Sequence, residues 1–176
     1  MSVGATTSAP TLATAQHRSP AGLPSDGATH GPRRALLFRQ ERVIHFSDCD
    51  PAGIVFYPQY FVMLNAHIED WFTEGLGVDY YALVAERRIG LPTVRLEVDF
   101  VAVSKMGDRV AIELEVERIG GASLTLRRHI SGIAGDRRVT MRQVLVTTSL
   151  ETHRAIELPA DLRAALMRAT DPSAVA

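Results

Sequence analysis

The spacing of apolar residues changes once along this chain, from a helical period to a strand period, and no other feature restricts the fold as much. From Pro58 onward, apolar side chains recur every three or four residues, at Phe61, Leu64, Ile68, Trp71 and Phe72. This spacing places them on one face of a helix, where we expect Trp71 and Phe72 to be core residues. Proline suits a helix's first turn and Gly75 suits its end, which predicts a helix of about 18 residues.

After this helix, apolar residues alternate with polar ones. The segments with this strand-like pattern are Val94–Phe100, Val110–Val116, Leu124–Ile130 and Val139–Leu150. Glycine-containing turns separate the later ones, which predicts antiparallel strands, each with one half-buried face. A first strand is expected within Leu36–Phe46 and a terminal helix at Asp161–Ala169. The pattern therefore predicts an α+β fold, in which one long helix packs on an antiparallel sheet.

Composition separates a tail from this domain. Residues 1–34 are rich in Ala, Ser, Thr, Gly and Pro and contain one acidic residue, Asp26. Such a segment buries too little apolar surface to offset its ordering entropy, so we predict a disordered tail at 1–34 and a folded domain at 35–170.

The overall composition also bounds the partners of the chain. Nineteen basic residues balance twenty acidic ones, so no overall positive field favours nucleic acid or an anionic membrane. No apolar run reaches the roughly 18 to 20 residues needed to cross a bilayer. The single cysteine excludes an intrachain disulfide and is consistent with a reducing compartment. We therefore expect a cytoplasmic protein.

Asp48, Cys49 and Asp50 lie between the first strand and the long helix, and their chemistry has three interpretations. Two aspartates at this spacing can ligate Mg²⁺, but that motif usually follows an apolar strand of a parallel sheet, so we expect no metal. Cys49 would need a nearby base such as His45 to act as a nucleophile, and a small buried cysteine is the commoner outcome.

The third interpretation concerns Asp50, which precedes the turn Pro51-Ala-Gly53. The following helix directs its free N–H groups and the positive end of its dipole toward this turn. A carboxylate held there can act on a carbonyl compound while backbone amides stabilise the developing oxyanion. The alternative is that Asp48 and Asp50 only cap the turn, and spacing alone favours that.

A longer motif changes this balance. The run Asp48-Cys-Asp-Pro-Ala-Gly-Ile-Val-Phe-Tyr-Pro-Gln-Tyr60, with the helix and sheet after it, resembles the hotdog-fold thioesterases, and most closely the 4-hydroxybenzoyl-CoA thioesterase family. The resemblance covers roughly residues 36 to 165. It implies hydrolysis of an acyl-CoA thioester without metal or cofactor. Asp50 would be the nucleophile or general base, and the supporting or substrate-binding residues would be Asp48, Gly53, Tyr57, Phe61 and His67.

Other residues keep two interpretations beside this resemblance. His67 is either a pocket residue or a hydrogen-bonded structural histidine, and Glu69 and Asp70 are either solvated or the helix acids that some family members use. The family often binds the CoA phosphates with a basic turn, but this chain has Gly120-Gly-Ala122 there. The candidates for that contact are then Arg118, Arg127 and Arg128, unless they are ordinary strand-face charges.

The resemblance also implies an assembly and a substrate class. Hotdog subunits pair, with sites between two chains, so we expect a homodimer or homotetramer. An aromatic acyl-CoA is the favoured substrate. The alternatives are a short aliphatic acyl-CoA, an acyl group on carrier protein, or a hotdog protein that binds acyl-CoA without turnover.

Overall fold

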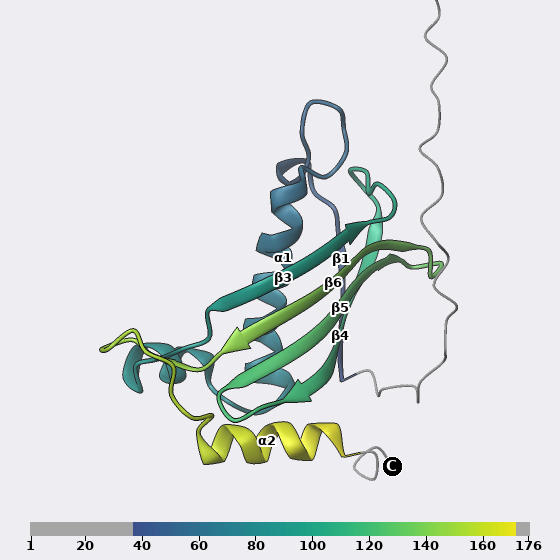
Figure 1. The fold of residues 1–176 in the computed structure, drawn as a ribbon. Helices are drawn as coiled ribbons and strands as arrows, with labels where there is room; N and C mark the ends of the chain where they lie inside the picture. Colours follow the sequence, from purple (N-terminus) through teal and green to yellow (C-terminus); the bar gives the residue numbers. More distant parts are fainter. Residues whose placement is uncertain (1–36, 172–176) are drawn as a thin grey trace, which may run out of the picture. The chain divides into compact units, whose positions relative to one another are not determined.

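The computed structural model describes residues 37–171, which fold around a five-stranded antiparallel sheet with the strand order β1-β4-β5-β6-β3 (Figure 1). A separate pair is formed by β2 and β7. The strands are β1 (Phe38–Val43), β2 (Ile89–Gly90), β3 (Thr93–Phe100), β4 (Arg109–Ile119), β5 (Ser123–Gly132), β6 (Arg137–Val146) and β7 (Thr148–Ser149). The tail predicted at 1–34 lies outside the described residues and stays a prediction.

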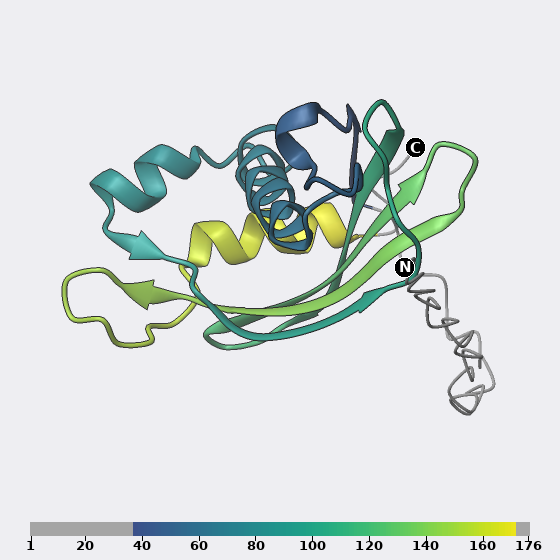
Figure 2. The same cartoon turned by 90° about the horizontal axis from the view of Figure 1, so that it is seen from above.

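The helices agree closely with the sequence pattern. The long helix α1 (Tyr57–Asp70) continues into a π-helical turn (Trp71–Gly75), and α2 (Ala160–Thr170) follows the last strands. Figure 2 shows α1 and α2 on the same side of the sheet, which curves around α1. The predicted α+β architecture is confirmed. None of the helices within residues 37–171 is long and apolar enough to cross a membrane.

The core lies between α1 and the sheet and has two parts. Near the end of α1, Trp71 and Phe72 are fully buried against strand and α2 side chains such as Leu126. Nearer its start, Met63 and Leu64 pack against β4, β5 and β6. The expectation that Trp71 and Phe72 are core residues is confirmed, because their spacing places both on the face of the helix that meets the sheet.

Strand β3 departs from its predicted half-buried state. Its apolar residues Val94, Leu96 and Phe100 are 59%, 40% and 51% exposed. The physical reason is its place at the edge of the sheet, where β6 is its one partner strand among residues 37–171. A long, apolar edge strand with unpaired backbone groups is a template for pairing with another chain.

The opposite face of the sheet is charged. Arg142 of β6 lies 3.0 Å from Glu117 of β4, across the intervening β5, and Arg39 of β1 lies 3.7 Å from Glu113 of the neighbouring β4. The apolar side chains of the sheet therefore lie on its other side, where α1 and α2 are placed and where Leu96 and Phe100 of β3 stay exposed.

Candidate active site

Asp50 stands in a tight turn that its own backbone closes. The N–H of Gly53 donates to the Asp50 carbonyl at 2.9 Å, and the Asp50 N–H donates to the Ile54 carbonyl at 3.0 Å. Gly53 has φ +75°, which residues with a side chain rarely adopt. The Asp50 Oδ1 atom accepts a hydrogen bond from the Ala52 N–H at 2.8 Å. The predicted capping is therefore present, yet Oδ2 has no hydrogen-bond partner within residues 37–171.

Asp48 has a different environment from Asp50. It is buried, and its Oδ2 accepts hydrogen bonds from the His45 N–H at 2.8 Å and from Arg42 Nη2 at 3.1 Å. Its backbone carbonyl accepts from the Phe56 N–H at 2.9 Å. Asp48 thus connects the end of β1 to the segment that enters α1, and it holds the turn that carries Asp50.

Cys49 lies between these carboxylates. Burial, with the charges of Asp48 and Asp50, raises the pKa of its thiol, and its Sγ is 3.5 Å from the His45 carbonyl. A raised pKa reduces the thiolate fraction, which disfavours the nucleophile interpretation. Across residues 37–171, no group of three or more His, Cys, Asp or Glu side chains is placed to hold a metal ion.

Helix α1 begins seven residues after Asp50, and its first turn supplies polar backbone groups. Tyr57 is its first residue, with Pro58 next, and the preceding Phe56 makes no side-chain cap hydrogen bond. The N–H groups of a helix's first turn have no intrahelical partner and carry the positive end of the helix dipole. The Tyr57 N–H is one of these groups. A developing oxyanion near this end of α1 would therefore be stabilised.

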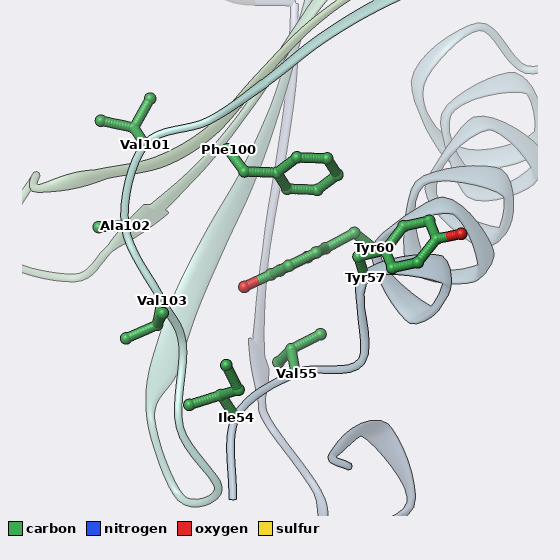
Figure 3. A pocket seen from close by; sticks show the side chains of 8 residues that line it. All are labelled: Ile54, Val55, Tyr57, Tyr60, Phe100, Val101, Ala102 and Val103. Carbon is green, nitrogen blue, oxygen red and sulfur yellow. The ribbon is translucent and has the colours of Figure 1, made fainter. Parts of the chain in front are cut away.

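A pocket of about 260 Å³ adjoins this helix start (Figure 3). The segment that follows the Asp50 turn forms one wall, and the end of β3 with the residues after it forms the other. Its lining residues are Ile54, Val55, Tyr57, Tyr60, Phe100, Val101, Ala102 and Val103. A hydrogen bond of 2.9 Å from the Val55 N–H to the Ser104 carbonyl joins the two walls.

Three of the residues that line this pocket are aromatic, namely Tyr57, Tyr60 and Phe100. The Phe100 ring centroid lies 6.2 Å from that of Tyr57, 6.0 Å from that of Tyr60 and 6.4 Å from that of Phe61. Such distances allow favourable edge-to-face contacts, so a planar aromatic group suits this lining. The sequence indicated Tyr57 and Phe61, but it assigned Phe100 to the core, because alternation alone does not reveal which strand lies at the edge.

His67 and Arg128 lie in the interior rather than at the pocket. Each is 1% exposed, and His67 Nδ1 is 3.0 Å from Arg128 Nη2. Burial, with the nearby Arg128 charge, lowers the pKa of His67 to about 3, so the ring is neutral. This burial favours the structural interpretation of His67, and it places the Arg128 side chain away from the surface where CoA phosphates would bind. The alternation of β5 contained this signal, because Arg128 shares the parity of Leu126 and Ile130.

The other predicted charges are separate from the Asp50 turn. Arg118 and Arg127 are exposed, with Arg127 3.7 Å from Glu117, and a phosphate contact by either stays a prediction. Glu69 and Asp70 line a second hollow at the far end of α1. The helix rise of 1.5 Å per residue puts them roughly 20 Å from the start of α1.

Comparison with known proteins agrees with this geometry. Residues 44–166 match the family profile of the thioesterase-like superfamily. The 4-hydroxybenzoyl-CoA thioesterase of Pseudomonas sp. is 34% identical over 135 residues, which cover 73% of this chain and 94% of that protein. A 1,4-dihydroxy-2-naphthoyl-CoA hydrolase of Picosynechococcus sp. is 32% identical over 82 residues, which cover 47% of this chain and 56% of that protein.

A solved structure extends the likeness to three dimensions. It is a 4-hydroxybenzoyl-CoA thioesterase with an aspartate-to-asparagine substitution, complexed with 4-hydroxybenzoyl-CoA. It has a TM-score of 0.66 and 30% identity, and the match covers 73% of this chain and 96% of that one. The chain therefore belongs to the thioesterase-like superfamily, as a hotdog-fold member of the 4-hydroxybenzoyl-CoA thioesterase family.

Proposed function

We propose that this chain hydrolyses an aromatic acyl-CoA thioester, with the Asp50 carboxylate as nucleophile or general base. Its family makes it an enzyme of the thioesterase class. The observation that carries the proposal is the Asp50 carboxylate, whose Oδ2 has no partner within residues 37–171. Its turn leads directly into Ile54 and Val55 at the wall of an aromatic pocket.

The proposed reaction places the thioester carbonyl at the start of α1. The Tyr57 N–H and the helix dipole would polarise the carbonyl oxygen. In one route Asp50 attacks the carbonyl carbon, CoA leaves as a thiolate, and water hydrolyses the resulting mixed anhydride. In the other route Asp50 takes a proton from water as the water attacks the same carbon. Both routes yield a carboxylic acid and free CoA.

The size and lining of the pocket support an aromatic acyl group. The Pseudomonas and Picosynechococcus relatives are named for one-ring and two-ring aromatic acyl-CoA substrates. A pocket of about 260 Å³ whose lining includes Tyr57, Tyr60 and Phe100 has room for a single ring. A benzoyl group with polar substituents is therefore the preferred substrate, ahead of aliphatic or carrier-bound acyl groups.

The proposed enzyme is at least a homodimer that forms along β3. If two β3 strands pair antiparallel with Leu96 on the two-fold axis, Arg95 of each copy lies opposite Glu97 of the other. Each such cross-strand pair stabilises the contact by about 0.2 to 1 kcal/mol, whereas a shift that sets Glu97 against Glu97 is unfavourable. Pairing would also cover the exposed Leu96 side chains. A homotetramer would be a dimer of this unit, and a cytoplasmic location remains part of the proposal.

Thiol release from a panel of aromatic and aliphatic acyl-CoA substrates tests this function. Wild type is expected to release CoA fastest from a hydroxylated benzoyl-CoA. Asp50→Asn should lose on the order of 10²-fold or more in kcat, because it removes a catalytic base or nucleophile. Asp70→Asn is the matched control, since Asp70 lies at the far end of α1.

Other outcomes would contradict the proposal in different ways. Full activity of Asp50→Asn would reduce Asp50 to a turn cap. Loss of activity in Asp70→Asn alone would move the catalytic acid to the helix. Tight binding of acyl-CoA without thiol release by wild type would favour a binding protein.

A further inference from the structure

Arg128 is a buried cation for which residues 37–171 provide no carboxylate. Its guanidinium contacts two neutral groups, the Gln143 Oε1 atom at 3.2 Å and the His67 Nδ1 atom at 3.0 Å, and its Nε has no partner among those residues. Burial lowers the pKa of Arg128 to about 9, so it stays protonated at neutral pH. A buried charge is costly unless it is compensated. The side chains that are hydrogen-bonded to Arg128 indicate which groups can compensate this charge.

The hydrogen bonds from Arg128 lead in one direction, toward the edge of the sheet. Arg128 Nη1 donates to Gln143 Oε1, and Gln143 Nε2 donates to Thr93 Oγ1 at 2.8 Å. Because the Thr93 oxygen accepts this bond, its own O–H is left to donate outward. Hydrogen bonds in such a chain polarise one another, so the cation strengthens the Thr93 hydroxyl as a donor to an electron-rich oxygen.

Thr93 is the first residue of β3 and is exposed. It lies opposite Leu145, a core residue, because a bulge at Val94 interrupts the pairing of β3 with β6. The hydroxyl therefore faces the helix side of the sheet, as the pocket residue Phe100 does. In the proposed β3 pairing, the bulge puts Thr93 of one copy in the place that residue 94 would hold, opposite Val98 of the other copy and two residues from Phe100 on the same face.

We propose that Arg128, acting through Gln143, makes the Thr93 hydroxyl of one protomer a hydrogen-bond donor to an oxygen substituent on the acyl group bound by the other protomer. This inference rests on the proposed function and on pairing through β3. The ligand class is an acyl-CoA whose ring carries a hydroxyl, phenolate or carboxylate oxygen far from the thioester. Thr93 is then a specificity residue, and Gln143 and Arg128 are positioning residues.

The test compares 4-hydroxybenzoyl-CoA with benzoyl-CoA, which lacks the oxygen. Thr93→Val keeps the side-chain shape and removes the donor. It should lower the ratio of kcat/KM for the two substrates about tenfold, with benzoyl-CoA changed less than about twofold. Thr93→Ser should restore the ratio. Thr140→Val, on the charged face of the sheet, is the matched control and should leave both values unchanged.

A mixed dimer tests the crossing between protomers. A Thr93→Val subunit with Asp50 intact is paired with an Asp50→Asn subunit with Thr93 intact. In this mixed dimer, the subunit with the active Asp50 carries Thr93→Val, so its substrate can contact an intact Thr93 only from the partner subunit. If Thr93 acts across the interface, the mixed dimer should therefore regain the wild-type ratio. A ratio that stays low would place Thr93 in the same protomer as its pocket and overturn the proposal.

The failures of this inference and of the proposed function are distinguishable. Turnover of both substrates with an unchanged ratio in Thr93→Val would overturn the inference and leave the function intact. If wild type binds acyl-CoA without turnover, the proposed function fails. The dissociation constants of the two substrates for wild type and Thr93→Val, measured by calorimetry, then decide the inference by the same tenfold criterion.

Discussion

At the residue scale, the two carboxylates of the turn differ in what their oxygens contact. The buried Asp48 binds Arg42 and a backbone N–H, whereas Asp50 uses Oδ1 for a backbone N–H and its Oδ2 has no hydrogen-bond partner within residues 37–171. The sequence predicted that both would lie at this turn. It predicted their different roles only through resemblance to a family, because contacts with Arg42 depend on how β1 enters the turn.

The buried His67 and the half-buried His129 predict how stability depends on pH. Burial lowers the pKa of His67 to about 3 and that of His129 to about 4. In the unfolded chain both titrate near 6.5, so unfolding takes up protons below that pH. The stabilisation that comes from the lowered pKa values is fully present above about pH 6.5. We expect the free energy of unfolding to fall by about 1 kcal/mol per pH unit for each histidine as the pH decreases from 6 to 5.

Urea unfolding of wild type, His67→Gln and His129→Gln at pH 6 and pH 5 measures this effect. His67→Gln and His129→Gln should each lose part of the pH dependence of the free energy of unfolding, whatever their absolute stability. His153 is exposed, so His153→Gln should keep the wild-type pH dependence. An unchanged slope in His67→Gln would mean that His67 is protonated in the folded protein.

At the element scale, one arginine holds the pocket wall that follows β3. The Arg138 guanidinium donates to the Val103 carbonyl and lies 3.5 Å from the Asp108 carboxylate. The Arg138 carbonyl accepts hydrogen bonds from the N–H groups of Val101 at 2.8 Å and Ala102 at 3.2 Å. Side chain and backbone of one β6 residue thus fix three residues of the wall.

Arg138→Met should loosen this wall while leaving Asp50 and the start of α1 unchanged. We expect KM to rise several-fold with kcat within about twofold, the signature of lost binding that is uniform between ground state and transition state. Arg137→Met, which removes an exposed cation 3.8 Å from Glu113 on the charged face, is the matched control. An unchanged KM, or a loss confined to kcat, would contradict this role.

The elements themselves were largely predictable from the sequence. The helix from Pro58 to Gly75 and the five strands of the sheet follow from changes of period and from glycine turns. Which elements lie beside one another in the fold was harder to predict from the sequence. The burial of β3 was overestimated because alternation reports a shared face but not an edge position. The short pair of β2 and β7 was missed because two-residue strands carry no period.

At the scale of the whole molecule, the β3 edge predicts association. Light scattering of wild type at micromolar concentration should give at least twice the mass of one chain. Leu96→Glu should shift the protein toward the monomer, because it places two carboxylates together on the proposed two-fold axis. Met167→Glu alters an exposed apolar residue on α2 and should leave the mass unchanged. A monomeric wild type would overturn both the dimer and the site that it completes.

The bulge in β3 makes substrate choice depend on the number of residues in this strand. Thr93 lies opposite Leu145 and Arg95 lies opposite Val144, so Val94 is one residue more than the ladder needs. In a regular ladder with the same residues, Val94 would take the place opposite Leu145, and the Thr93 hydroxyl would turn to the charged face. A single insertion or deletion near residue 94 can therefore change which acyl groups are selected, without substituting any residue that contacts them.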